Sequence, residues 1–170
     1  DYSIAAAADK RLTLLIGNRT HGDGSHYADT VEPGAATEIE GPFGGYRLER
    51  NAHRKVFVAT GTGLAPFLPM FDEMAEAGEL GAAELVFGCR TTAEDITRAL
   101  APLPPRTTVC AGRDEASNAA FRGRVTAAVS SLAFDPATTD FYVCGSAAMV
   151  ADCRAILGRA GAKRILTELY

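Results

Sequence analysis

The sequence lacks several patterns that would assign it to common functional classes. None of its four cysteines pairs with another as C-x-x-C, which argues against a zinc ribbon and an iron–sulfur cluster. No apolar stretch approaches the length of a membrane span. There is no basic run, and the net charge of −4 gives no support for binding to nucleic acid or anionic membranes. A secretory leader is also missing, so we expect a cytoplasmic protein.

The cysteines and histidines that are present indicate structural roles. Buried free thiols are the simplest interpretation for Cys89, Cys110 and Cys153. The three histidines are scattered through loop-like sequence, where surface residues are expected. We therefore predict no metal site.

The first part of the chain has the composition of strands and loops. Residues 1–5 (DYSIA) are typical of a strand interior, so we expect a fragment whose first part is missing. Residues 12–16 predict a strand and residues 17–26 a loop. Residues 37–40 alternate in polarity before a Gly-Pro pair ends them. These strands are too few to close a barrel.

From Lys55 onward the pattern changes to alternating strands and helices. Residues 56–59 form a short continuous apolar run, which is typical of a buried parallel strand. A helix is predicted over 65–77, with its apolar side chains on one face and Gly78 at its end. The remaining strands are expected at 84–87, 107–110, 141–144 and 164–166, and the remaining helices at 93–101, 122–132 and 147–159.

This order predicts an α/β fold, an open, doubly wound parallel sheet of five strands with helices on both faces. Ligands of such sheets bind beyond the carboxyl ends of the strands. Functional residues are therefore expected directly after each strand.

The segment at residues 60–66 (TGTGLAP) follows the first buried strand. Gly61 and Gly63 let backbone approach a phosphate closely, and the N–H groups at the start of the next helix favour an anion. Pro66 replaces the third glycine of the standard dinucleotide fingerprint and suits a first helical turn. A plain strand-to-helix turn would have the same sequence features, so this segment alone does not establish that the chain binds a nucleotide.

Three further segments suit a cofactor, and each also has a simpler interpretation. Cys144 ends a strand and Gly145 permits close approach of a planar ligand, but a core cysteine before a turn is the alternative. Tyr170 could stack on a flat ring or cap the sheet edge. Gly24 and Ser25 could hold a pyrophosphate or form a loop tip.

Taken in order, these segments resemble the ferredoxin-reductase-like family of FAD- and NAD(P)H-binding oxidoreductases. The resemblance covers essentially all 170 residues. It implies that residues 1–48 are the C-terminal portion of an antiparallel FAD-binding β-barrel and that residues 49–170 are a Rossmann-like NAD(P)-binding domain. The segments that carry it are 2–5 (YSIA), 24–25 (GS), 33–44 (PG to GPFG), 60–66 (TGTGLAP), 87–90 (FGCR) with 94–96 (EDI), 142–145 (YVCG) and 168–170 (ELY).

The resemblance also implies roles for single residues. Tyr2 and Ser3 would contact the flavin ring, Ser3 near N5, while Cys144 would lie against the nicotinamide. Glu168 would stand near the reaction centre, and Tyr170 would cover the flavin face. The implied catalytic residues are Ser3, Cys144 and Glu168. The implied cofactor-binding residues are Tyr2, Ser3, Gly24, Ser25, Thr60, Gly61, Thr62, Gly63, Pro66, Arg90, Arg113, Cys144, Gly145, Met149 and Tyr170.

The choice between NADH and NADPH depends on basic residues that follow the strands. A 2′-phosphate needs arginine or lysine, and Arg90 and Arg113 are the candidates. Asp114 and Glu115 stand beside Arg113 and would repel a phosphate, which favours NADH. Arg113 could also be a solvated loop charge.

Two functions fit the resemblance, and a nucleotide-binding fold with neither activity is a third option. One is a flavoprotein reductase that passes hydride from NAD(P)H to FAD and electrons on to a ferredoxin, an oxygenase or a haem partner. The alternative is a subunit that docks nucleotide or flavin without turnover of its own. Cys144 and the Glu168-x-Tyr170 terminus favour the first. This interpretation requires the Gly61–Gly63 turn, Cys144 and Tyr170 to gather at one slot.

Overall fold

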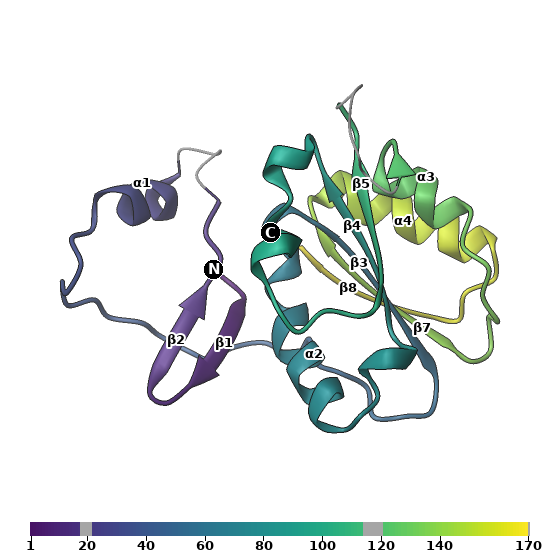
Figure 1. The fold of residues 1–170 in the computed structure, drawn as a ribbon, viewed down its shortest axis with the longest axis horizontal. Helices are drawn as coiled ribbons and strands as arrows, with labels where there is room; N and C mark the ends of the chain where they lie inside the picture. Colours follow the sequence, from purple (N-terminus) through teal and green to yellow (C-terminus); the bar gives the residue numbers. More distant parts are fainter. Residues whose placement is uncertain (18–21, 114–120, 170) are drawn as a thin grey trace.

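The computed structural model describes residues 1–17, 22–113 and 121–169. It consists of a layered α/β part and a smaller, loosely folded N-terminal part (Figure 1). The described part of the α/β unit contains one sheet of six strands, all parallel, in the order β6-β5-β4-β3-β7-β8. The strands are β3 (Arg54–Thr60), β4 (Glu84–Cys89), β5 (Arg106–Ala111), β6 (Phe121–Arg122), β7 (Thr139–Gly145) and β8 (Arg164–Leu169).

Helices cover both faces of this sheet (Figure 1). On one face lies α2 (Phe67–Glu76), and on the other lie α3 (Val125–Ser130) and α4 (Ala147–Arg159). Short 3₁₀ turns complete the connections: η1 (Gly61–Leu64), η2 (Leu80–Ala82), η3 (Thr92–Glu94) and η4 (Ile96–Ala99). The doubly wound parallel architecture predicted from the sequence is confirmed.

Strand alternation explains the continuous apolar runs. Along β3, Val56 and Val58 pack toward α3 and α4, whereas Phe57 and Ala59 pack toward α2. A strand covered on both faces must be apolar at successive positions. β7 is buried over its whole length for the same reason.

Three elements differ from the expectation. The sheet has a sixth strand, β6, whose two residues are too few to leave a periodic signal. The helix predicted at 93–101 is replaced by η3 and η4, because the Asp95 side chain accepts a hydrogen bond from Thr97 N and caps a new turn there. The helix predicted from residue 65 begins at Phe67, after η1.

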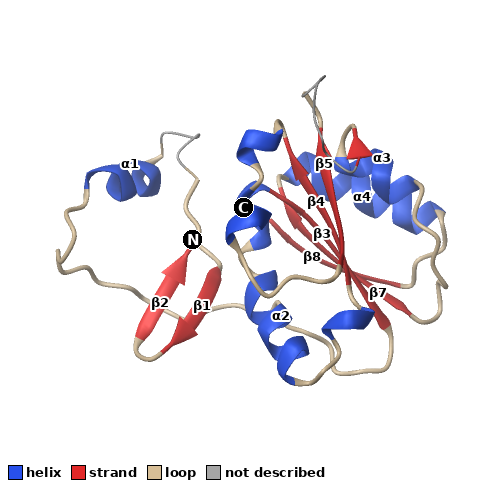
Figure 2. Cartoon of the chain, in the orientation of Figure 1, coloured by secondary structure: helices blue, strands red, loops and turns tan. Residues whose placement is uncertain are grey.

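The N-terminal part contains a hairpin and one helix. β1 (Ile4–Ala8) pairs antiparallel with β2 (Arg11–Leu14). The turn residues Asp9 and Lys10 both have positive φ, 50° and 61°, as a two-residue hairpin turn requires. The loop predicted at 17–26 instead leads into α1 (Asp23–Thr30), and residues 37–40 form no strand (Figure 2).

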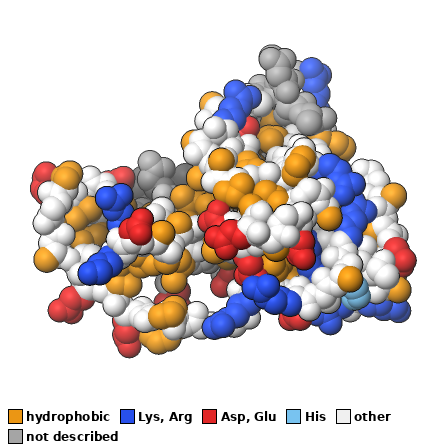
Figure 3. Space-filling model, turned by 60° about the horizontal axis from the view of Figure 1, so that its bottom comes forward, with side chains coloured by type: hydrophobic (Ala, Val, Ile, Leu, Met, Phe, Trp, Pro, Cys, Tyr) orange, Lys and Arg blue, Asp and Glu red, His pale blue; other side chains and the backbone are white. Residues whose placement is uncertain are grey.

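Apolar side chains reach the surface of both parts (Figure 3), but most of the large ones that are exposed belong to the N-terminal part. Small side chains and few strands leave it without a substantial core of its own, so its larger apolar residues remain exposed. The exposed large apolar residues before residue 48 are Tyr2, Leu12, Tyr27, Val31, Ile39 and Phe43.

Candidate functional site

The carboxyl ends of the three adjacent strands β3, β7 and β8 carry one row of predicted site residues. Ala59, Cys144 and Glu168 are direct neighbours in the two strand pairings. Cys144 is 1% exposed. Burial, with a smaller contribution from Glu168, raises the pKa of its thiol to about 12. The thiol is therefore neutral near pH 7.

Ser3 joins this row from the other end of the chain. It forms a side-chain hydrogen bond with Glu168. Burial raises the pKa of Glu168, and the hydrogen bond from Ser3 partly offsets this. Glu168 Oε2 is buried and has no hydrogen-bond partner among the described residues. The structure thus brings together all three residues predicted to be catalytic.

The turn that follows β3 is in direct contact with the end of β7. A Cβ atom at Gly63 would overlap the carbonyl oxygen of Cys144 and lie 2.7 Å from its carbonyl carbon. A Cβ at Gly145 would overlap Met149 Cε and Thr60 Oγ1. Only glycine allows two backbones to approach this closely. The predicted nucleotide loop and Cys144 therefore share one location, and Tyr170 lies outside the described residues.

Two more residues of this loop have defined places. Pro66 is buried and precedes α2 with φ −67°, a value to which its ring restricts it anyway. Thr62 faces the N-terminal part, since a Cβ at Gly17 would lie 3.5 Å from Thr62 Cγ2. Gly61 has φ +53°, which favours glycine at that position.

The predicted flavin-pyrophosphate residues lie at the start of α1. The ring of Tyr2 covers Gly24, where a Cβ would be 2.6 Å from Tyr2 Cζ. The Ser25 side chain is buried, and its hydroxyl donates a hydrogen bond to Gly17 O at 2.9 Å. A phosphate would have to compete with this carbonyl for the hydroxyl proton, so the role of Ser25 stays a prediction.

The two arginines weighed for a 2′-phosphate are neighbours. Arg113 N donates to Arg90 O at 2.8 Å, because the ends of β4 and β5 lie side by side. Both residues are exposed. Asp114 and Glu115 lie outside the described residues, so their expected repulsion stays a prediction.

The sequence analysis missed one residue of this region, Tyr46. It lies in the segment that leads from the N-terminal part to β3, and its hydroxyl donates to Leu166 O at 3.3 Å. Burial raises its pKa above the usual range, and Cys144 and Glu168 add to this effect. A single aromatic residue in a polar segment gives no periodic signal, so only the fold reveals it.

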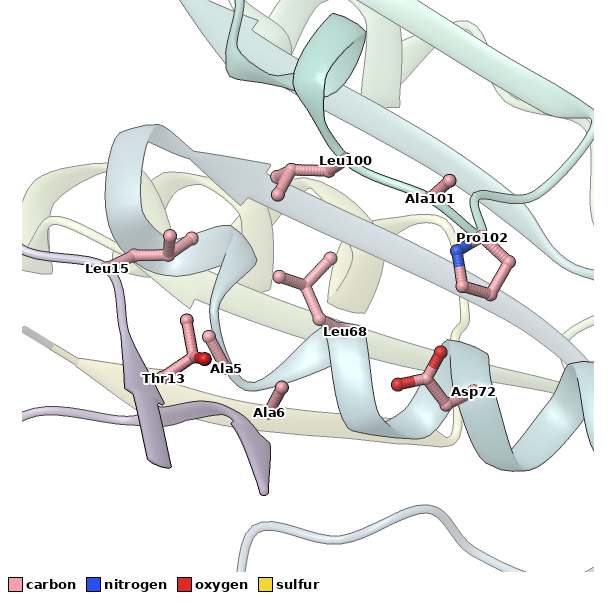
Figure 4. A pocket seen from close by; sticks show the side chains of 9 residues that line it. All are labelled: Ala5, Ala6, Thr13, Leu15, Leu68, Asp72, Leu100, Ala101 and Pro102. Carbon is pink, nitrogen blue, oxygen red and sulfur yellow. The ribbon is translucent and has the colours of Figure 1, made fainter. Parts of the chain in front are cut away.

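Two hollows lie away from the row of Cys144 and Glu168. One, of about 450 Å³, separates the β1–β2 hairpin from α2 and is mostly apolar (Figure 4). The other, of about 980 Å³, lies at the amino ends of the strands beside His53 and Lys55. Neither is lined by a residue predicted to bind a cofactor. In the described part of the chain, no group of three or more His, Cys, Asp or Glu is placed to hold a metal ion.

Comparison with known proteins agrees with this geometry. Residues 57–155 match the family described as the oxidoreductase NAD-binding domain. The ferredoxin--NADP reductase B of Sorangium cellulosum is 35% identical over 100 residues, which cover 57% of this chain and 41% of the relative. The 2-halobenzoate 1,2-dioxygenase electron transfer component of Burkholderia cepacia is 30% identical over 168 residues, which cover 92% of this chain and 49% of the relative.

A solved structure is similar over almost the whole chain. The flavohem-like FAD/NAD binding domain of nitric oxide dioxygenase from Vibrio cholerae O1 biovar El Tor superposes with a TM-score of 0.81 at 21% identity. The match covers 99% of this chain and 76% of that chain. The chain spans less than half the length of the two curated relatives above. None of the helices described is long and apolar enough to cross a membrane.

Proposed function

Because this chain belongs to the oxidoreductase NAD-binding domain family, we propose that it binds NAD(P)H and passes hydride to FAD, with electrons continuing to a protein partner. The partner is a ferredoxin, an oxygenase component or a haem domain. One observation carries the proposal: the glycine loop after β3 touches Cys144, and Cys144 is the direct neighbour of Glu168, which Ser3 reaches from the N-terminal part.

The residues present fit a nucleotide at this place. Gly61 is exposed with a positive φ, so its peptide groups remain accessible at the end of β3. Glu168 Oε2 is a buried acceptor that finds no hydrogen-bond partner within the described residues. Leaving such an atom unsatisfied costs about 1–3 kcal/mol. A donor group on a bound ligand would remove this cost.

The protein's own contribution is orientation. NAD(P)H supplies the hydride and FAD accepts it, and the reaction requires the two rings to be held in close alignment without water. Cys144 contributes a neutral, buried thiol at the end of β7, which suits packing against a flat ring and not nucleophilic attack. Ser3 and Glu168 join the N-terminal part to the nucleotide sheet at the same point.

We propose NADH as the preferred nucleotide. Arg90 and Arg113 lie together at the ends of β4 and β5. In this proposal they meet the adenosine end of the ligand. The acidic residues at 114 and 115 oppose a 2′-phosphate. Calorimetric titration of the chain with NADH and with NADPH tests this choice, and clearly tighter binding of NADPH would reverse it.

The function itself is tested with Cys144→Ala in the flavin-loaded protein. We expect the limiting rate of flavin reduction by NADH to fall about tenfold or more, because ring alignment is lost. The dissociation constant of the nucleotide should change by less than about threefold. Cys153→Ala is the matched control, since Cys153 is equally buried but packs on the opposite face of the sheet.

Each outcome distinguishes the two candidate functions. Slow reduction in Cys144→Ala with normal rates in Cys153→Ala supports the reductase. Nucleotide binding without flavin reduction in the unmodified protein favours the docking subunit. Reduction at the unmodified rate in Cys144→Ala overturns the role given to this thiol.

A further inference from the structure

Three rows of side chains cross the α2-facing side of the sheet. Each row runs from β3 through β7 to β8, and successive rows are two residues, or roughly 7 Å, apart along the strands. The rows are Lys55, Asp140 and Arg164; then Phe57, Tyr142 and Leu166; then Ala59, Cys144 and Glu168. The first row is ionic, the second is mainly aromatic, and the third belongs to the candidate site.

The segment of residues 46–53, here called the connecting segment, crosses the same side and contacts the rows in turn. At its end, Asn51 Nδ2 donates to Asp140 Oδ2 at 2.9 Å, and His53 Nδ1 lies 2.8 Å from Asp140 Oδ1. In the middle, Glu49 N donates to Tyr142 Oη at 2.8 Å. The connecting segment is therefore attached to β7 at alternate residues, in an order that leads toward Cys144.

Tyr46 makes the last of these attachments, next to the site row. Its hydroxyl donates to Leu166 O on β8, and its ring packs against that of Tyr142 on β7. Leu166 lies two residues before Glu168, and Tyr142 lies two residues before Cys144. The ring centroid of Tyr46 lies 6.1 Å from that of Tyr142 and 6.1 Å from that of Phe67, so the ring packs against both.

We propose that Tyr46 is a positioning residue: its hydroxyl bonds β8 and its ring packs on Tyr142 of β7, one row before the site row, so that it holds Cys144 and Glu168 in place. This inference rests on the proposed function for its catalytic consequence. A residue that packs on one strand and bonds the next restrains the relative position of the two strands at that point. The same residue belongs to the connecting segment, so it also ties the N-terminal part to the site.

Tyr46→Phe tests the bond to β8, because it removes one oxygen and keeps the ring. Amide hydrogen exchange in the nucleotide-free chain is the first readout. We expect exchange at Cys144, Gly145 and Glu168 to become about fivefold faster, as the loss of one ordinary hydrogen bond predicts. In the flavin-loaded protein, the limiting rate of reduction by NADH should fall while the nucleotide dissociation constant stays within about twofold.

Tyr142→Phe is the matched control. It also removes one phenolic oxygen bonded to the connecting segment, but that oxygen serves Glu49 N and does not join β7 to β8. We expect this variant to change the rate of amide exchange near Glu49 and to leave the exchange rates at Cys144 and Glu168 as they are in the unmodified chain. Unfolding by urea shows whether the two variants differ in overall stability.

The remaining outcomes are decisive as well. Equal exchange at Cys144 and Glu168 in the two variants overturns the positioning role, as does faster exchange spread over the whole sheet in Tyr46→Phe. Failure of the unmodified chain to bind either nucleotide defeats the proposed function instead, and the exchange result still decides whether Tyr46 holds the two strands.

Discussion

Ser3 is hydrogen-bonded to Glu168, so residues near the two ends of the chain meet at the end of β8. The bond lowers the pKa of the Glu168 carboxyl, which burial raises more strongly. Glu168 is therefore a group whose protonation depends on contact between the N-terminal part and the sheet.

Ser3→Ala should raise the pKa of Glu168 further. The variant removes the hydrogen bond that favours the carboxylate and leaves burial unchanged. Carbon-13 NMR titration of the glutamate carboxyl measures the shift. Ser130→Ala is a suitable control because its hydroxyl bonds Ala127 O on the surface of α3. An unchanged or lower pKa in Ser3→Ala would mean that the bond has no role in the folded protein.

Glu168→Gln should alter how stability depends on pH. The folded-state pKa of Glu168 lies above its ordinary value of 4.5, so above pH 4.5 the folded state holds this proton more tightly than the unfolded state. The free energy of unfolding therefore falls as pH rises through the window between the two pKa values. Urea unfolding from pH 4 to pH 8 should show this fall in the unmodified chain and a flatter profile in Glu168→Gln.

Asp140→Asn should destabilise the fold by roughly 3 kcal/mol, since it leaves the buried Lys55 ammonium without its carboxylate partner. Burial alone would raise the pKa of Asp140, but hydrogen bonds from His53, Asn51 and Lys55 outweigh it and lower the pKa to about 2. Stability from this group is therefore complete above pH 3.8 and is lost as pH falls toward 2. The variant should lack that acid-induced loss.

The surface pair of Arg50 and Glu73 provides the control for Asp140→Asn. The two side chains are 78% and 37% exposed, and such pairs contribute about 0–1 kcal/mol. Arg50→Gln should therefore unfold almost as the unmodified chain does. A similar loss of unfolding free energy in Arg50→Gln and Asp140→Asn would show that the buried pair of Asp140 and Lys55 contributes no more to stability than the surface pair.

Gly63→Ala should disturb the contact between the turn after β3 and the end of β7. The added methyl group would meet the backbone of Cys144, which has no flexible end to move away. We expect a loss of about 1–3 kcal/mol in stability and weaker nucleotide binding. Gly81→Ala, in η2, meets no atom within 4 Å and serves as the control. Normal binding by Gly63→Ala would place the nucleotide elsewhere.

Local sequence patterns were sufficient to predict the strands of the sheet and several residues of the candidate site. The apolar runs of β3 and β7 and the glycines at 61, 63 and 145 are visible in the sequence because their causes are local: burial on both faces and close backbone approach. Periodicity does not detect a strand of two residues such as β6. It also does not detect a turn that is set by one side chain, such as the turn at Asp95.

By itself, the amino-acid sequence determined that strands alternate with helices and that glycine-rich turns follow the central strands, because these follow from residue type and spacing. Only the tertiary structure decided that Ser3 bonds Glu168, that Asn51 and His53 reach Asp140, and that Tyr46 bonds β8 while its ring packs on β7. These contacts join residues distant along the chain. Their partners are set by strand order and register, which no local pattern contains.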